Sequence, residues 1–175
     1  MYHSFEAILL FLATLAVASV LEADIIFFSN PGCNRNNDWV YCSEVPPGYC
    51  CQAMKPFCTS LSCDHCSDKT LAGFRNTYSC PGLDQADTAC NPSTDVSCCL
   101  DADDSNTKAS STDQAISEAP TNSTCLTPDG MVYHDAAGVR REIKSMTAEA
   151  YQKAMDLYGR GDLEALNGTI MSAQE

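Results

Sequence analysis

Basic residues are scarce in this chain. Its 175 residues include 10 Lys and Arg against 23 Asp and Glu, so the formal net charge is −13 at pH 7. Nucleic acids and anionic lipids attract proteins through basic patches, because Lys and Arg neutralise their phosphate groups. The composition therefore argues against both as partners and is typical of an acidic, well-solvated surface.

Catalytic motifs are also missing. The sequence has no Gly-x-Ser-x-Gly, Walker, His-Glu-x-x-His or Gly-x-Gly-x-x-Gly pattern. This excludes the common serine hydrolases, P-loop NTPases, zinc proteases and dinucleotide-binding enzymes. We expect that the protein is not an enzyme, and we predict no catalytic residue and no cofactor.

Two short patterns resemble metal sites but are incomplete. The run Cys-Asp-His-Cys at 63–66 has zinc-type ligands, yet zinc pairs usually occur with a second, matching pair. The acidic run from Asp101 resembles the opening of a calcium loop. Asn106 stands where that loop needs Gly, however, and Thr112 stands where a bidentate Glu belongs. We therefore predict no metal site.

Long apolar stretches are limited to the N-terminus. Residues 7–21 are apolar apart from one Thr and one Ser. A bilayer span needs about 20 residues, and a shorter core is typical of a signal peptide. Ala18 and Ala23 are the candidate cleavage sites. We predict that residues 1–23 are a signal peptide, that the protein is secreted, and that the mature chain does not insert into membranes.

Cysteine, in contrast, is abundant. The count of twelve is even, and in a secreted chain such a set predicts a disulfide framework rather than metal ligands. Most of these cysteines precede residue 100, where few apolar runs are available to build a core, so disulfides must supply part of the stability. The predicted disulfide cysteines are Cys33, Cys42, Cys50, Cys51, Cys58, Cys63, Cys66, Cys80, Cys90, Cys98, Cys99 and Cys125.

Composition divides the chain into segments. A Cys-rich part is followed by a stretch rich in Ser, Thr, Asp and Ala without aromatics, and then by a part with helix-forming stretches. We therefore predict a fold of small disulfide-rich modules with short helices, a flexible linker and a C-terminal α-helical segment. The predicted units are a signal peptide at 1–23, a first cysteine module at 24–70, a second, incomplete one at 71–99, an acidic Ser/Thr-rich linker at 100–124 and a helical segment at 125–175.

The second cysteine block partly repeats the first. The spacing C-x8-C-x7-C-C from Cys33 is echoed by C-x9-C-x7-C-C from Cys80, with almost no similarity between the cysteines. Because the second block holds only four cysteines, it needs Cys125 or a cysteine of the first block to pair fully.

The first block has a sharper resemblance. Six of its cysteines follow the spacing C-x8-C-x7-C-x7-C-x4-C-x2-C, with Gly48-Tyr49 before the third and Met54 four residues before the fourth. This pattern resembles the ShKT family, the fold of a sea-anemone potassium-channel toxin that recurs in nematode and other animal secreted proteins. The resemblance implies two short helices and three disulfides, which here would be Cys33–Cys66, Cys42–Cys58 and Cys50–Cys63.

Alternatives to this pairing stay open, because Cys51 is an additional cysteine and the gap between the fourth and fifth cysteines is one residue too long. The Cys50-Cys51 doublet also fits an inhibitor cystine knot, which keeps two of these bridges and pairs Cys33 with Cys51. Hydrophobins also have two Cys-Cys doublets, but four cysteines would be surplus and the intervening segments are too polar for an amphiphilic film.

The ShKT resemblance also indicates two interaction residues. The toxin has a Lys-Tyr pair directly after the matching Met, and its Lys plugs the channel pore as a compact cation. Here Lys55 follows Met54, but Pro56 takes the Tyr position and Phe57 comes next. We predict Lys55 and Phe57 as candidate contact residues, and we keep an ion-channel or protease modulator as an alternative function.

The C-terminal segment has local signals for helices. Asp135 and Thr147 can each cap a helix, because their side-chain oxygens accept hydrogen bonds from backbone N–H groups. Gly159 and Gly161 end the second helix, and Asp162 can cap a third.

The same segment resembles a second family. A Cys-Leu-Thr-Pro-Asp-Gly opening at Cys125, the run Arg-Arg-Glu-Ile-Lys-Ser-Met-Thr at 140–147 and a Tyr-x2-Ala-Met helix from Tyr151 resemble the noncatalytic start of the tyrosinase domain in nematode tyrosinase-like proteins. A type-3 copper pair needs six imidazoles, whereas only His65 and His134 remain after signal cleavage. A truncated or partial tyrosinase-like copper oxidase therefore stays an alternative, although the chain as it stands cannot be a tyrosinase.

Two Asn-x-Ser/Thr sequons are predicted glycosylation sites, at Asn122 and Asn167. Together these features predict a secreted, noncatalytic, cysteine-rich glycoprotein. We expect it to act as an extracellular binding module for an unknown extracellular protein or receptor.

Overall fold

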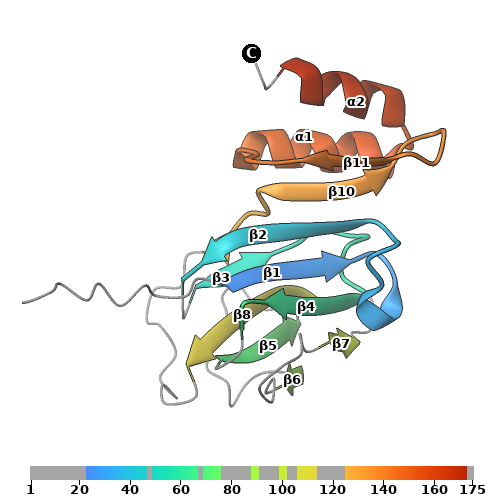
Figure 1. Ribbon diagram of the computed structural model, residues 1–175. Helices are drawn as coiled ribbons and strands as arrows, with labels where there is room; N and C mark the ends of the chain where they lie inside the picture. The colour runs from blue at the N-terminus through green and yellow to red at the C-terminus, as the bar shows by residue number, and fades with distance from the viewer. Residues whose placement is uncertain are drawn as a thin grey trace, which may run out of the picture.

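The computed structural model describes residues 23–46, 49–66, 69–75, 88–90, 99–101, 106–113 and 125–172. Its strands form two sheets, and two helices lie beside the C-terminal strands (Figure 1). The elements are β1 (Ala23–Phe28), the short 3-10 helix η1 (Pro31–Cys33), β2 (Trp39–Val45), β3 (Cys50–Gln52), β4 (Ser60–Asp64), β5 (Lys69–Arg75), β6 (Thr88–Cys90), β7 (Cys99–Asp101), β8 (Asn106–Asp113), β9 (Cys125–Leu126), β10 (Gly130–His134), β11 (Arg140–Ile143), α1 (Ala148–Gly159) and α2 (Leu163–Ser172).

The larger sheet has six strands in the order β11-β10-β2-β1-β4-β7, and every neighbouring pair is antiparallel. The smaller sheet has five strands in the order β6-β5-β8-β3-β9, in which only β3 and β9 run parallel. Both sheets combine strands that are far apart in the sequence. Strand pairing therefore joins the C-terminal part of the chain to the N-terminal part.

Strand β1 explains why the core forms here. Side chains alternate between the two faces of a strand, and in β1 both faces are apolar. Ile25 and Phe27 belong to a main core that residues of both sheets and α1 share, whereas Ile26 and Phe28 belong to a second core on the opposite face. All four side chains are buried. This apolar run therefore makes β1 a central strand rather than an edge.

The predicted fold class is wrong, because the protein is mostly β-sheet and the described residues contain two short α-helices. The predicted linker contains β8, which pairs with β3 on one side and with β5 on the other. A Ser/Thr-rich stretch can form a strand when both of its edges are hydrogen-bonded, because the ladders satisfy its backbone groups. The composition of the segment did not reveal these partners.

The C-terminal segment begins with strands rather than with a helix. Asp135, predicted as a helix cap, instead closes the turn between β10 and β11. Its Oδ1 accepts the N–H groups of Ala137 and Val139 at 3.0 and 2.9 Å, and its Oδ2 accepts Arg141 Nε at 2.9 Å. The Val139 N–H and the Arg141 guanidinium hold the pKa of Asp135 below its ordinary value, against the opposing effect of desolvation. Gly138 supplies the positive φ of 75° that this turn requires.

The two later caps are confirmed. Thr147 Oγ1 accepts the N–H of Ala150 at 3.2 Å at the start of α1. Asp162 Oδ1 accepts the N–H of Ala165 at 3.2 Å before α2. Gly161 separates the two helices with a φ of 71°. Among the described residues, neither helix is long and apolar enough to cross a membrane.

The prediction of a cysteine-rich, disulfide-bonded chain is confirmed, but the pairs differ from those that the resemblances imply. The described disulfides are Cys33–Cys99, Cys42–Cys51 and Cys63–Cys66, which replace all three ShKT pairs and also the Cys33–Cys51 pair of the knot. Strand pairing decides these partners. Cys99 is in β7, which pairs with β4, and Cys33 Sγ lies 3.2 Å from the carbonyl oxygen of Leu61 in that same strand.

Gly130 is required by close packing in the larger sheet. It lies opposite Tyr41, and a Cβ at Gly130 would be 1.9 Å from Cζ of the tyrosine ring. We expect Gly130→Ala to displace this ring and to lower the free energy of unfolding by about 1–3 kcal/mol. Denaturant titration followed by fluorescence measures this change.

Gly159→Ala is the matched control. An added Cβ at Gly159 meets nothing within 4 Å, so the same substitution is expected to be neutral or stabilising by about 0.5–1 kcal/mol. Equal unfolding midpoints for Gly130→Ala and the wild type would contradict the packing role of Gly130.

Candidate interaction surface

The two residues predicted as contacts lie in different environments. Lys55 is exposed, in the connection between β3 and β4. Phe57 is fully buried, and its ring centroid lies 5.1 Å from that of Tyr158. The backbone N–H of Met54 donates to the hydroxyl of Tyr151 at 3.1 Å, which holds this connection against α1. Phe57 is therefore a packing residue of the main core and is not available to a partner.

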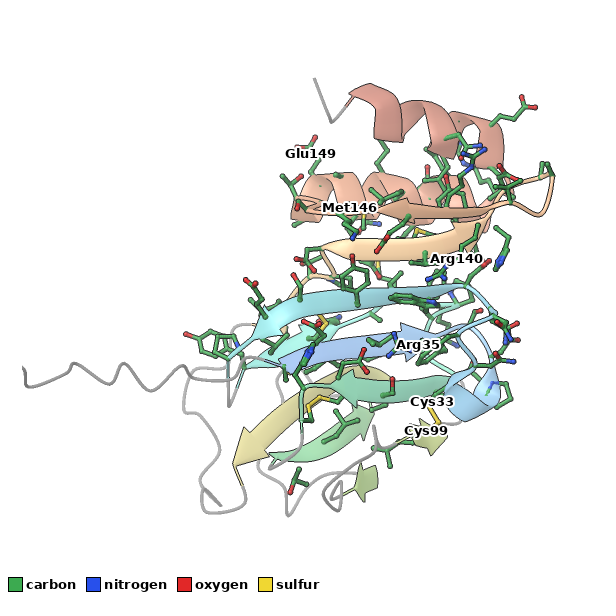
Figure 2. The ribbon with its side chains drawn as sticks, viewed as in Figure 1. Cys33, Arg35, Cys99, Arg140, Met146 and Glu149 are labelled. Carbon is green, nitrogen blue, oxygen red and sulfur yellow. A yellow bond between two sulfur atoms is a disulfide. The ribbon has the colours of Figure 1, made fainter. Side chains whose placement is uncertain are left out.

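A different set of polar and aromatic residues gathers around the buried ring of Trp39. We call Arg35, Trp39, Tyr41 and Arg140 the arginine–tryptophan surface. The guanidinium carbons of Arg35 and Arg140 lie 5.3 and 5.9 Å from the centroid of the Trp39 ring. The Tyr41 ring centroid lies 5.3 Å from the same ring. In Figure 2, the labelled Arg35 and Arg140 both lie toward one end of the larger sheet.

The sheet register brings these side chains to one face. Trp39 and Tyr41 are two residues apart in β2 and therefore point to the same side. Trp39 is opposite Val132 in β10, and His134 of that strand is opposite Arg140 in β11. Trp39 and Val132 belong to the second core, so the surface lies on the face opposite the main core.

The two arginines differ in their ionic partners. Arg35 Nη2 lies 2.7 Å from each carboxylate oxygen of Asp64, in an ion pair whose two side chains are 42% and 35% exposed. Solvent screens such a pair, so it orients Arg35 more than it stabilises the fold. No carboxylate among the described residues pairs with Arg140, which is exposed. The guanidinium of Arg140 therefore remains able to bind a carboxylate of another molecule.

Trp39 has a buried polar atom of its own. The residue is only 7% exposed, and its Nε1 has no hydrogen-bond acceptor among the described residues. A buried N–H without an acceptor costs free energy comparable to a lost hydrogen bond. The two arginines thus lie over the ring of a tryptophan whose N–H group has no acceptor among the described residues.

Asp38 fixes the position of this surface. Its Oδ1 accepts the backbone N–H of His134 at 2.9 Å and lies 2.7 Å from His134 Nδ1, and its Oδ2 accepts the hydroxyl of Tyr158 at 2.6 Å. One carboxylate therefore connects the start of β2, the end of β10 and the last turn of α1. Burial and the Asp38 carboxylate raise the pKa of Tyr158.

No local pattern in the sequence reveals this cluster. Asp38 is separated by 96 residues from His134 and by 120 residues from Tyr158. The only local signal is Trp39 beside an acidic residue, which does not identify partners so far away. Sequence analysis therefore missed the residues that the structure brings together.

The remaining predicted sites are placed as follows. Asn167 lies half-buried in α2, where its Oδ1 accepts the hydroxyl of Tyr133 at 2.5 Å. The Cys63–Cys66 disulfide occupies both sulfurs of the zinc-like run, and His65 Nδ1 lies 3.6 Å from Asp24. Residues 1–22 of the predicted signal peptide, together with Cys80, Cys98 and Asn122, lie outside the described residues.

The chain was also compared with known proteins. No model of a protein family, no curated protein and no solved structure matches it.

The Asp38 cluster makes a prediction about alkaline stability. A raised tyrosine pKa means that the folded state holds the proton more tightly than the unfolded state. The stabilisation from Tyr158 is therefore present at neutral pH and is lost as the pH rises above about 10, the ordinary pKa of tyrosine. We expect Tyr158→Phe to lower the unfolding free energy at neutral pH by about 1–2 kcal/mol. The unfolding free energy of the variant should also fall less steeply with rising pH in the alkaline range.

Urea titrations across this pH range measure both effects. Tyr49→Phe is the control, because Tyr49 is 46% exposed and no described residue hydrogen-bonds its hydroxyl group. A Tyr158→Phe protein with wild-type stability at neutral pH and a wild-type alkaline slope would show that the Asp38 hydrogen bond contributes nothing.

Proposed function

We propose that this protein is a secreted, noncatalytic binding protein whose arginine–tryptophan surface contacts another extracellular protein. The observation that supports this proposal most directly is Arg140, which makes a cation–π contact with Trp39 and has no carboxylate partner among the described residues. Trp, Tyr and Arg are the residue types that contribute most often to the binding energy of protein interfaces.

The geometry of the surface favours binding because it is already ordered. The cation–π contact with Trp39 restricts the Arg140 guanidinium, so less side-chain entropy is lost when a partner pairs with it. Tyr41 is held by a hydrogen bond from its hydroxyl to Glu142 Oε1 at 3.3 Å. Asp38 holds the underlying strands together. A partner carboxylate placed on Arg140 would lie beside an aromatic ring, where the reduced access of water strengthens the ion pair.

The charges around the surface specify the kind of partner. Asp64 and Glu142 flank the arginines, and the whole chain is strongly acidic. An acidic chain attracts basic proteins over long distances, whereas Arg140 selects a carboxylate at short range. We propose a protein partner that presents a carboxylate within a basic or mixed-charge surface.

Secretion is the second part of the proposal. The described disulfides support it, because such bonds persist mainly in oxidising compartments. Ala23 also distinguishes the two candidate cleavage sites, since it is the first residue of β1, is fully buried, and pairs with Val45. Cleavage after Ala18 leaves β1 complete, whereas cleavage after Ala23 removes its first residue.

We therefore replace the predicted boundary at Ala23 by cleavage after Ala18. A chain expressed with its own N-terminus in eukaryotic secretory cells is expected to appear in the medium with Ser19 as its first residue. N-terminal sequencing and intact mass before and after reduction test this expectation. Retention inside the cell with an unprocessed N-terminus would contradict secretion, and a start at Asp24 would contradict the cleavage site alone.

The binding proposal is tested with three variants. Immobilised wild type, Arg140→Ala, Arg140→Lys and Arg160→Ala are compared for the extracellular proteins that each retains, and affinities for a retained protein are then measured. We expect Arg140→Ala to weaken binding at least tenfold, or about 1.4 kcal/mol, and Arg140→Lys to restore only part of it, because Lys lacks the planar guanidinium.

Arg160→Ala is the matched control, because Arg160 is 61% exposed and pairs with Asp156 of the same helix. It is expected to bind like the wild type. Equal retention by all four proteins would show that the arginine–tryptophan surface is not the binding site.

A further inference from the structure

The smaller sheet places two cysteines in direct register. Strand β9 is an edge strand that runs parallel to β3, and Cys125 is the partner of Cys50. Neighbouring strands lie about 4.8 Å apart, and partner side chains in a pair of strands point to the same face. A disulfide needs Cα atoms that are about 4.4–6.8 Å apart. The backbone therefore already has the geometry for a bond between these two residues.

The two cysteines are in different chemical states. Cys50 is fully buried and disulfide-bonded, whereas Cys125 is a half-buried free thiol. A free thiol thus lies beside a disulfide sulfur on the same face of the sheet. The neighbouring Cys42–Cys51 disulfide is less suited to attack, because Cys51 points to the other face of β3 and its partner in β9 is Leu126.

We propose that Cys50 and Cys125 form an internal thiol–disulfide exchange pair. The Cys125 thiol loses its proton, and the thiolate attacks Sγ of Cys50. A Cys50–Cys125 bond forms as the present bond of Cys50 breaks, and the former partner of Cys50 leaves as a thiolate that takes up a proton. The numbers of disulfides and thiols do not change, so the step needs no oxidant or reductant.

The exchange changes how the C-terminal part is held. Cys125 is the last cysteine of the chain, so no disulfide joins residues 125–175 to the rest while its thiol is free. This part contains β10, β11, α1 and α2. Exchange ties it covalently to β3 through β9. The pair thus switches the protein between a C-terminal part held by strand pairing, hydrogen bonds and packing and one that a disulfide also holds.

The experiment uses the full secreted chain. One sample is quenched in acid and another is first incubated at about pH 8.5, the ordinary pKa of a cysteine thiol. Both are alkylated without reduction, digested, and mapped by mass spectrometry. We expect the label on Cys125 in the quenched sample and, because twelve cysteines leave an even number of thiols, on at least one further cysteine. After incubation we expect a Cys50–Cys125 peptide, with the label moved from Cys125 to the former partner of Cys50. The rate should rise roughly tenfold per pH unit below the thiol pKa and should not depend on protein concentration.

Cys125→Ser is the control, because Ser preserves the size of the side chain at a half-buried position without an existing disulfide. Its disulfide map should be identical before and after incubation, and circular dichroism verifies its fold. A Cys50–Cys125 peptide already complete in the quenched wild type also supports the pair, since the exchange has then finished. The proposal is overturned if Cys125 keeps the label throughout, or if it forms only concentration-dependent bonds between two chains.

Discussion

The arrangement of the whole molecule depends on the burial of β1 on both faces. Ile25 and Phe27 contact the main core, Ile26 and Phe28 contact the second core, and β2 and β4 pair with the two edges of the strand. Removing either neighbour would expose a row of backbone groups and apolar side chains, which is costly. The second core places Trp39 beside Phe28, so the strand that stabilises the fold also supports the arginine–tryptophan surface.

The disulfides contribute unequally to the stability of this arrangement. In the chain-entropy view, a disulfide stabilises more when it closes a longer loop. The Cys33–Cys99 bond spans 66 residues and contributes about 4 kcal/mol on that scale, against about 2 kcal/mol for Cys63–Cys66, which spans 3 residues. Cys33–Cys99 fastens β7, the last strand of the larger sheet, to the 3-10 helix η1 (Figure 2). The Cys33–Cys99 disulfide therefore secures an edge of the larger sheet, whereas Cys42–Cys51 joins the two sheets within the main core.

The features that the sequence could predict are local ones. Thr147 and Asp162 cap helices by accepting N–H groups three residues later in the chain, and the sequence predicts both caps. Asp135 has the same ability to accept backbone N–H groups, but it uses this ability in a hairpin turn, because β10 has β2 as a partner. Cysteine spacing could not choose disulfide partners, since Cys99 reaches Cys33 only through the pairing of β7 with β4. Contacts between distant segments decide the fold, and they leave no periodic signal.

Hydrogen bonds around β10, and not a disulfide, position the C-terminal part of the chain. Asp129, in the short connection between β9 and β10, accepts the N–H of Ser43 in β2 at 2.8 Å, and Asp38 holds both His134 and Tyr158. These bonds place β10 against β2 while Cys125 is a free thiol. A Cys50–Cys125 disulfide is therefore not needed to position the surface around Arg140, and we expect it to act when the C-terminal part has separated from β2. It keeps the C-terminal part close after these bonds break and makes their re-formation faster.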